Sequence, residues 1–218
     1  AYAQNQSLVD HMRGWSALSD KLYVWDYTTN FHNYIGPHPN FPALQGNARF
    51  FRDNRVVGLF EQGAAEGPHA EFGELRGWLL AKLLWDPDAD VDALLEDFYT
   101  KFYVEAAGPM REYYETLEKA AVASGVHLAR QRPYREVVQL FTPGLLKELE
   151  RCVSAAEGKA RDEEVRKRVA LVRASLDYAK VCSDYLRELD RVRRSGPYPW
   201  VGHAAEARAR EVGQPYLQ

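Results

Sequence analysis

Apolar residues in the first sixty positions follow two different periods. From residue 5 to 18 they recur every three or four positions, which predicts a helix. Two short runs, 22–26 and 56–60, are rich in β-forming residues and are apolar on both faces, as in parallel strands buried on both sides. A short helix is expected between them, over about 44–54. This order of elements predicts parallel strands joined by a crossover helix.

From residue 71 onward the helical period dominates. We expect helices over about 71–85, 91–102, 110–124, 143–157 and 162–193, and then a short polar helix to about 212. Gly108 and Pro109 are expected to break the chain, and residues 125–142 are less regular. The helix over 162–193 carries a nearly heptad apolar stripe. It is therefore expected to pack in a helical bundle, with the charge run 161–168 on its solvated face.

The predicted fold class is mostly α with a small parallel β part. The helix that ends near residue 85 runs into an Asp-Pro pair, and proline disfavours helix for the residue before it. We therefore expect one domain over 1–87, which carries the strands, and a helical domain over 88–218. Two strands do not make a stable parallel sheet. Either other strands come from elsewhere, or the chain is the tail of a larger barrel.

Composition and net charge indicate which class of protein this is and which partners it is expected to bind. With 46% hydrophobic and 27% charged residues, the chain is ordinary for a globular protein and long enough to bury a core. A net charge of −3 gives no reason to expect nucleic acid or an anionic membrane as partner. No apolar run approaches the roughly 20 residues that span a bilayer. The chain begins at Ala1 within a helical region, which suggests a processed product or an excised fragment.

The two cysteines, Cys152 and Cys182, do not make a disulfide framework. Both lie in helical patterns, so one bridge between neighbouring helices stays open as an alternative. We expect buried free thiols. Cysteine usage therefore does not set the compartment.

Each predicted strand ends in a carboxylate. Asp26 closes the first strand and Glu61 follows the second. Paired acids are what glycoside hydrolysis needs, because one protonates the leaving oxygen while the other activates water or attacks directly. The alternatives are structural: Asp26 as a turn residue that binds backbone amides, and Glu61 in a salt bridge to Arg49 or Arg76.

A long loop over 28–42 follows the first strand, and loops of this length in compact domains are usually functional or disordered. Its aromatic residues argue against disorder. The candidate substrate-binding residues in and around the two loops are Trp25, Tyr27, His32, His38, Asn40, Gln62 and His69. Each could instead fill the core or stabilise a loop. No histidine pair has a tight ligand spacing and no phosphate-binding loop is present, so neither a metal nor a cofactor is expected.

Four segments together resemble a known family. They are Tyr23-Val24-Trp25-Asp26-Tyr27, Pro39-Asn40, Gly58 to Gly63 and Glu74 to Pro87. This succession resembles the bacterial domain of unknown function 4838, which is usually classed with TIM-barrel glycoside hydrolases. The resemblance covers roughly residues 15–115.

The helix that ends in Leu84-Trp85-Asp86-Pro87 is also similar to the end of the last barrel helix in family 67 α-glucuronidases. In that family a strand that ends in an acid followed by tyrosine carries part of the water-activating apparatus. Asp26-Tyr27 matches this pattern.

The resemblance implies that the two strands are the seventh and eighth of a (β/α)8 barrel, followed by a helical bundle. It implies cleavage of glycosidic bonds in a poly- or oligosaccharide, with Asp26 as base or nucleophile, and an extracytoplasmic location. Six barrel units, including those that would carry the general acid, are then absent from this chain. Another chain or an N-terminal segment would complete the barrel. The competing interpretations are a non-catalytic carbohydrate-binding or interaction module and a mainly structural helical domain.

Overall fold

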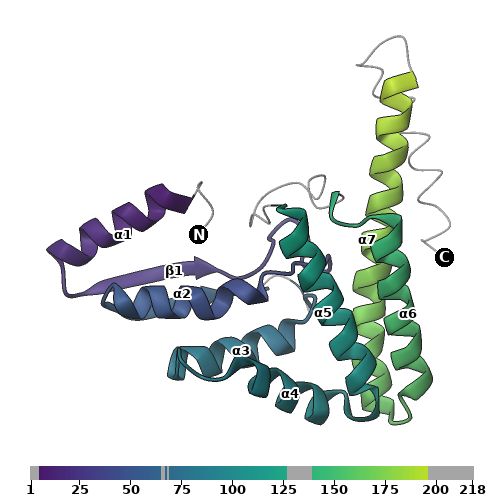
Figure 1. Cartoon of the computed structure of the whole chain (residues 1–218), viewed down its shortest axis with the longest axis horizontal. Helices are drawn as coiled ribbons and strands as arrows, with labels where there is room; N and C mark the ends of the chain where they lie inside the picture. Colours follow the sequence, from purple (N-terminus) through teal and green to yellow (C-terminus); the bar gives the residue numbers. More distant parts are fainter. Residues whose placement is uncertain (1–4, 65–66, 68, 127–138, 196–218) are drawn as a thin grey trace.

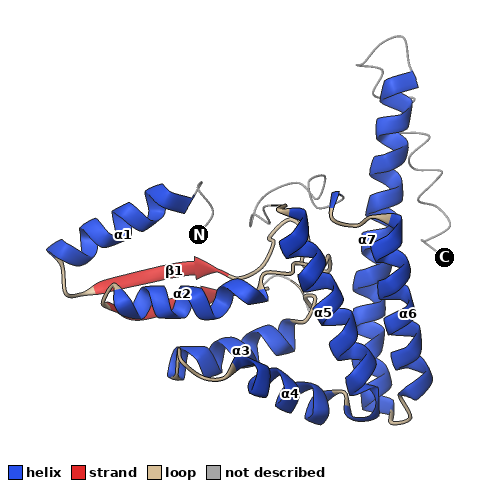
Figure 2. Ribbon diagram, viewed as in Figure 1, coloured by secondary structure: helices blue, strands red, loops and turns tan. Residues whose placement is uncertain are grey.

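A computed structural model describes residues 5–64, 67, 69–126 and 139–195 (Figure 1). Its elements are α1 (Gln6–Leu18), β1 (Leu22–Tyr27), α2 (Phe41–Asp53), β2 (Val56–Gln62), α3 (Gly73–Trp85), α4 (Val91–Phe102), the 3₁₀ helix η2 (Val104–Ala106), α5 (Ala107–Ser124), α6 (Pro143–Lys159) and α7 (Glu163–Ser195). Figure 2 shows that helices dominate and that the two strands lie together. The predicted fold class, mostly α with a small parallel β part, is confirmed.

The two strands pair in parallel, as the sequence predicted, with Val24 opposite Leu59. Their two faces differ. α2 packs against β2, and the face that carries Val24 and Leu59 is half-buried. The other face exposes Tyr23, Trp25 and Phe60. The prediction that both faces are buried is therefore wrong for the described residues, because no described element covers this second face.

The helix boundaries follow local capping chemistry. Asp90 accepts the Ala93 backbone N–H at 3.1 Å and starts α4, and Thr142 accepts the Leu145 N–H at 3.1 Å and starts α6. The chain break predicted at Gly108-Pro109 is wrong, because α5 already begins at Ala107. Pro109 therefore falls in the first turn, where a missing N–H costs no intrahelical bond.

One continuous hydrophobic core joins the helices from α2 to α7. It runs from Phe41 in α2 through Leu79 in α3 and Tyr113 in α5 to Leu149 in α6 and Leu176 in α7. α5 packs on α6, and α6 packs on α7, so these three helices form the predicted bundle (Figure 1). The core crosses residue 87, and the domain boundary predicted there stays a prediction.

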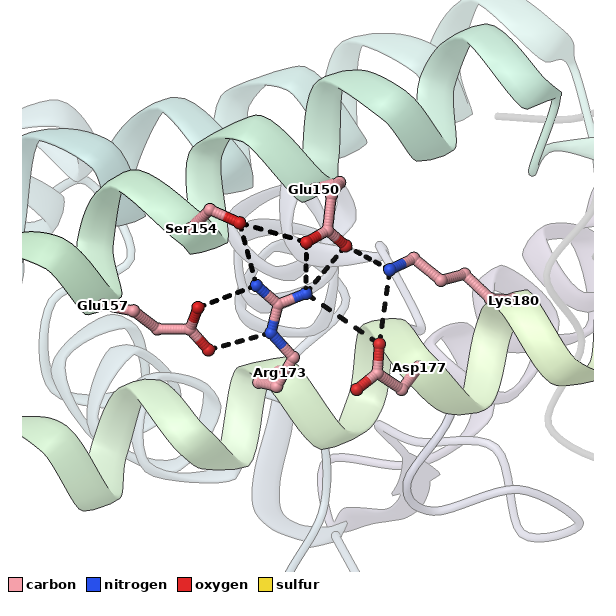
Figure 3. A network of polar contacts seen from close by, with 6 residues as sticks. All are labelled: Glu150, Ser154, Glu157, Arg173, Asp177 and Lys180. Carbon is pink, nitrogen blue, oxygen red and sulfur yellow. Dashed lines mark hydrogen bonds and ion pairs between the residues drawn. The ribbon is translucent and has the colours of Figure 1, made fainter. Parts of the chain in front are cut away.

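α7 is the longest helix, and its stripe faces the bundle as predicted. Every fourth or third residue from Val165 to Ala179 is buried, whereas most of the charge run 161–168 is exposed. On its α6 side Arg173 bonds to both Glu150 and Glu157, and Lys180 also reaches Glu150 (Figure 3). A polar network therefore fixes the register of the two helices beside their apolar seam.

Both cysteines are free thiols, as expected; Cys152 is buried and Cys182 is half-buried. No helix in the described part of the chain is both long and apolar enough to cross a membrane. The short helix predicted up to residue 212 lies outside the described residues.

Candidate active site

The carboxyl ends of the two strands bring Asp26 and Glu61 together. They are paired positions on neighbouring parallel strands, so their side chains leave the sheet on the same face. Thr28 joins the carboxyl ends of the two strands. Its backbone N–H and its hydroxyl both donate to the Gln62 carbonyl, at 3.0 and 3.1 Å. The two acids that the sequence singled out therefore lie side by side.

The Glu61 carboxyl is held in its neutral form more strongly than an ordinary glutamate. Burial, and then the negative charge of Asp26, raise the pKa of Glu61 from 4.5 to about 7. Its Oε2 is buried and makes no hydrogen bond. Asp26 differs, because one of its oxygens accepts the Tyr27 backbone N–H at 2.8 Å. The two neighbouring acids thus have unlike surroundings.

The salt bridge proposed as the alternative role of Glu61 is not formed with either arginine. Arg49 pairs with Asp88 at 2.9 Å, and Arg76 pairs with Glu71 at 3.6 Å. Glu61 instead lines a cleft, with one carboxyl oxygen buried.

A cleft of about 400 Å³ opens beside Glu61. Its walls come from the chain after β1, the chain after β2, and the first two turns of α3. The described lining residues are Thr28, Thr29, Glu61, Gly63, Ala64, Gly67, His69, Ala70, Gly73, Glu74, Arg76, Gly77 and Leu80. Hydroxyl, carboxyl, imidazole and guanidinium groups thus share one small space, and no Phe, Tyr or Trp is among these described residues.

Buried hydrogen bonds hold the cleft wall that follows β1. Asn40 donates from Nδ2 to the Thr28 carbonyl at 3.1 Å, and its Oδ1 accepts from the Arg76 guanidinium. Arg76 also donates to the His38 carbonyl at 3.2 Å, and the His38 N–H donates to Glu71 at 3.3 Å. The loop is therefore tied to α3 and to the segment that precedes it.

A row of aromatic rings lies on the far side of the strand ends. Trp25 is 63% exposed, yet its indole N–H donates to Gln62 Oε1 at 2.7 Å, which fixes the ring. Its centroid lies 4.9 Å from that of Phe60 and 6.4 Å from that of Tyr27, and Tyr27 contacts Phe31 edge-on at 5.4 Å. Alternation along the strand puts Trp25 on the face opposite Asp26.

The three candidate histidines lie in different environments. His69 is exposed and lines the cleft. His32 is exposed, and its backbone N–H bonds to Asn30 Oδ1 at 2.9 Å. His38 is buried, and burial together with the charge of Arg76 lowers its pKa to about 3, so it stays neutral at physiological pH.

The structure therefore separates the predicted site residues into groups. Glu61 and His69 line the cleft, and Asp26 stands beside Glu61. Trp25 and Tyr27 belong to the aromatic row, and Gln62 is hydrogen-bonded to Trp25. His38 and Asn40 hold the loop over 28–40, and His32 is exposed on it. The substrate-binding role assigned to these residues stays a prediction.

Four polar cleft residues, Thr28, Thr29, Glu74 and Arg76, were not predicted as site residues from the sequence. Thr28 and Thr29 follow directly after the acid and tyrosine of β1, and this position at a strand end is the signal that could have pointed to them. From the sequence, Arg76 was considered only as a salt-bridge partner of Glu61. No sequence signal shows that it reaches the cleft. No group of three or more His, Cys, Asp or Glu side chains in the described ranges is arranged to hold a metal ion.

A family model described as "Domain of unknown function (DUF4838)" matches residues 2–116. No curated protein and no solved structure matches the chain. The matched region includes both strands, both acids and α3, which are the segments that carried the resemblance. Because this match spans more than half of the 218 residues, the chain belongs to the DUF4838 family.

Proposed function

We propose that the chain is part of a carbohydrate-active hydrolase that cleaves glycosidic bonds in an oligo- or polysaccharide. The observation that carries the proposal is the side-by-side pair Asp26 and Glu61, in which Glu61 has a pKa of about 7. Glycoside hydrolysis needs two carboxyl groups, one able to donate a proton at neutral pH and one ionised. Two neighbouring acids in unlike surroundings meet that need.

The two acids divide the chemistry. Glu61 donates its proton to the oxygen of the leaving sugar, while Asp26 attacks the anomeric carbon as nucleophile. In the second step the Glu61 carboxylate takes a proton from water, whose oxygen displaces Asp26 from the sugar. Thr28, Thr29 and His69 offer hydrogen bonds to sugar hydroxyls along the cleft.

The strand geometry favours retention of configuration. Neighbouring strands lie about 4.8 Å apart, so paired side chains on one face start at that separation. Retaining enzymes hold their carboxyl groups about 5–5.5 Å apart and inverting enzymes about 6.5–9.5 Å apart. We therefore expect the product first released to have the anomeric configuration of the substrate, which NMR of early products measures.

Completion of the sheet is part of the proposal. β1 and β2 are the only strands in the described residues, and parallel sheets are stable when both faces are covered. The uncovered face carries Tyr23, Trp25 and Phe60. We propose that further strands, from a longer chain or a partner chain, pair with the edges of β1 and β2 and complete a (β/α)8 barrel, with both acids at the carboxyl-end rim of its strands. The isolated chain should then show little or no turnover.

The test is made on the full-length or completed protein. Glu61→Gln should reduce turnover by about 10²–10⁴-fold, the usual contribution of a positioned acid. Asp26→Asn should reduce turnover by orders of magnitude, because the nucleophile is lost. Asp20→Asn is the matched control, since Asp20 is an exposed acid just before the opposite end of β1. Near-normal turnover of the Asp26→Asn protein would exclude the assignment.

The second candidate is a non-catalytic carbohydrate-binding surface, and the fixed, exposed ring of Trp25 favours it. Aromatic rings of this kind stack on sugar faces. On this alternative, glycan binding occurs without release of sugar. Trp25→Ala would then abolish binding and Asp26→Asn would leave it unchanged, as measured by calorimetry with oligosaccharides.

A further inference from the structure

Buried ionisable groups gather behind the cleft, where the loop over 28–40, α3 and α5 meet. Arg76 pairs with Glu71 at 3.6 Å, and both side chains are at least 95% buried. Glu118 of α5 is buried too, and its charge interacts with both Glu71 and Arg76. The Arg76 guanidinium also lies 4.2 Å above the centre of the Phe41 ring. Two acids thus face one base inside the core.

Among the residues that the structure describes, no other buried base balances the second acid. His38 is neutral, for the reason given above. The other titratable groups that act on the cluster or on the tyrosines around it are Glu74 of α3, Asp92 and Tyr99 of α4, Tyr103 after α4, Tyr113 and Tyr114 of α5, Cys152 of α6, and Arg168 and Arg173 of α7. The two arginines act on Tyr103 and Tyr113, and each is bonded elsewhere, Arg168 to the Phe102 carbonyl and Arg173 to Glu150. If Glu71 and Glu118 were both ionised, the cluster would bury an uncompensated negative charge, which is strongly destabilising.

The hydrogen-bonding of the cluster is incomplete. Both Glu118 oxygens and Glu71 Oε1 are buried and make no hydrogen bond of good geometry, although the Phe41 backbone amide lies beside Glu118. The hydroxyls of Tyr99 and Tyr113 lack partners as well. A buried carboxylate without hydrogen bonds destabilises the fold when it is ionised. Protonation removes the charge and therefore most of this destabilisation.

We propose that Glu71 and Glu118 form a buried proton-binding site that carries one proton at neutral pH, and that losing this proton in mild alkali loosens the loop over 28–40. Burial raises the pKa of both carboxyls, that of Glu118 to about 8, while Arg76 opposes the rise. Because the two acids interact, their titration belongs to the pair.

The link to the loop is direct. Glu71 accepts the His38 N–H, while Arg76 holds the His38 carbonyl and the Asn40 side chain. When the second acid ionises, it competes with Glu71 for Arg76, which is the only guanidinium described in this cluster. The bonds from Arg76 to the loop are then weakened, and with them the wall of the cleft at Thr28.

The sign of the pH dependence follows from the raised pKa. In the unfolded chain a glutamate loses its proton near pH 4.5, its ordinary pKa. The folded pair of Glu71 and Glu118 keeps one proton up to about pH 8. The stability that this site contributes is therefore complete below about pH 4.5 and is lost as pH rises through about 8. Between these values the unfolding constant rises by up to about tenfold per pH unit from this site.

The experiment compares wild type with Glu118→Gln, which keeps the shape of the protonated acid. The free energy of unfolding, measured by urea titration between pH 5 and 9, should depend less on pH in the variant than in wild type. Hydrogen-exchange protection of the His38 and Asn40 amides should fall at least fivefold from pH 7 to 9 in wild type and stay constant in the variant. Glu112→Gln is the control, because Glu112 is an exposed acid on the same helix.

Two outcomes overturn the proposal. One is a Glu118→Gln protein that keeps the wild-type pH dependence of unfolding. The other is loop protection that is equal at pH 7 and 9 in wild type. Because neither measurement uses a substrate, a negative result leaves the hydrolase proposal standing, and an inactive enzyme leaves this one standing.

Discussion

The raised pKa of Glu61 has two causes that mutation can separate. Burial comes first and the charge of Asp26 second. Asp26→Asn removes only the second, so the pKa of Glu61 should fall from about 7 but stay above 4.5. Carbon-13 NMR of the labelled Glu61 carboxyl measures this titration. In the Asp20→Asn control the titration should be unchanged, and a rise after Asp26→Asn would contradict the pairing.

Glycine at position 125 meets a backbone requirement that alanine does not. Gly125 follows α5 with φ +63°, a left-handed conformation that costs other residues about 1 kcal/mol or more. Gly125→Ala should therefore lower the free energy of unfolding by about 1 kcal/mol, measured by denaturant titration.

Gly158 is the matched comparison, since it lies within α6, has no positive φ, and has open space where the Cβ of an alanine would lie. Gly158→Ala should raise the free energy of unfolding by about 0.5–1 kcal/mol. If both variants move stability in the same direction, backbone conformation is not what distinguishes the two positions.

At the scale of elements, the contact of α6 with α7 combines an apolar seam with the polar network of Figure 3. Burial alone would raise the pKa of Glu150, but hydrogen bonds from Lys180, Arg173 and Ser154 outweigh it and hold the pKa at about 2. The stability gained from this ionised form is present above about pH 4.5 and is lost as pH falls towards 2.

A double-mutant cycle between Glu150 and Arg173 tests the network. Because Glu150 is partly exposed, we expect a coupling free energy of only about 1 kcal/mol at pH 7, vanishing near pH 2. The exposed pair Glu164 and Lys167 on α7 is the control, for which we expect a smaller coupling because solvent screens it. Equal couplings for the two pairs would mean that the network adds nothing to the packing.

The pattern of apolar residues predicted the elements well, because the helices repeat apolar positions every three or four residues and the strands are short apolar runs. It failed where local geometry decides. α2 begins at Phe41 rather than at 44, since Pro42 fits the first turn of a helix. The first turn of α5 likewise accepts Pro109. In both cases a proline that was placed outside the predicted helix lies in its first turn, where helices tolerate it.

The candidate site could be predicted only in part. Asp26 and Glu61 were visible because each ends an apolar run, and parallel pairing then fixes their proximity. The roles of Arg76 and Glu118 were not visible, because the contacts that bury them join segments far apart in the chain. Hydrophobic periodicity carries no information about such contacts.

For the whole molecule, the continuous core predicts cooperative unfolding. Leu79 in α3 and Leu176 in α7 are fully buried members of the same cluster. Leu79→Ala should lower the free energy of unfolding by about 2–5 kcal/mol. Circular dichroism and tryptophan fluorescence should report one coincident transition, at a lower denaturant concentration than in wild type. Two separate transitions would instead support independent domains on either side of residue 87.

The length of α7 has a consequence for how the molecule moves in solution. Its 33 residues span about 50 Å, whereas the 17 residues of α6 span about 26 Å. Figure 1 shows α7 extending past the ends of α5 and α6. In that view the longest axis of the molecule is horizontal; α7 stands across it, whereas α2 lies along it. An elongated particle tumbles faster about its long axis than across it. N–H vectors of α7, which point along that helix, should therefore show shorter rotational correlation times in ¹⁵N relaxation than N–H vectors of α2.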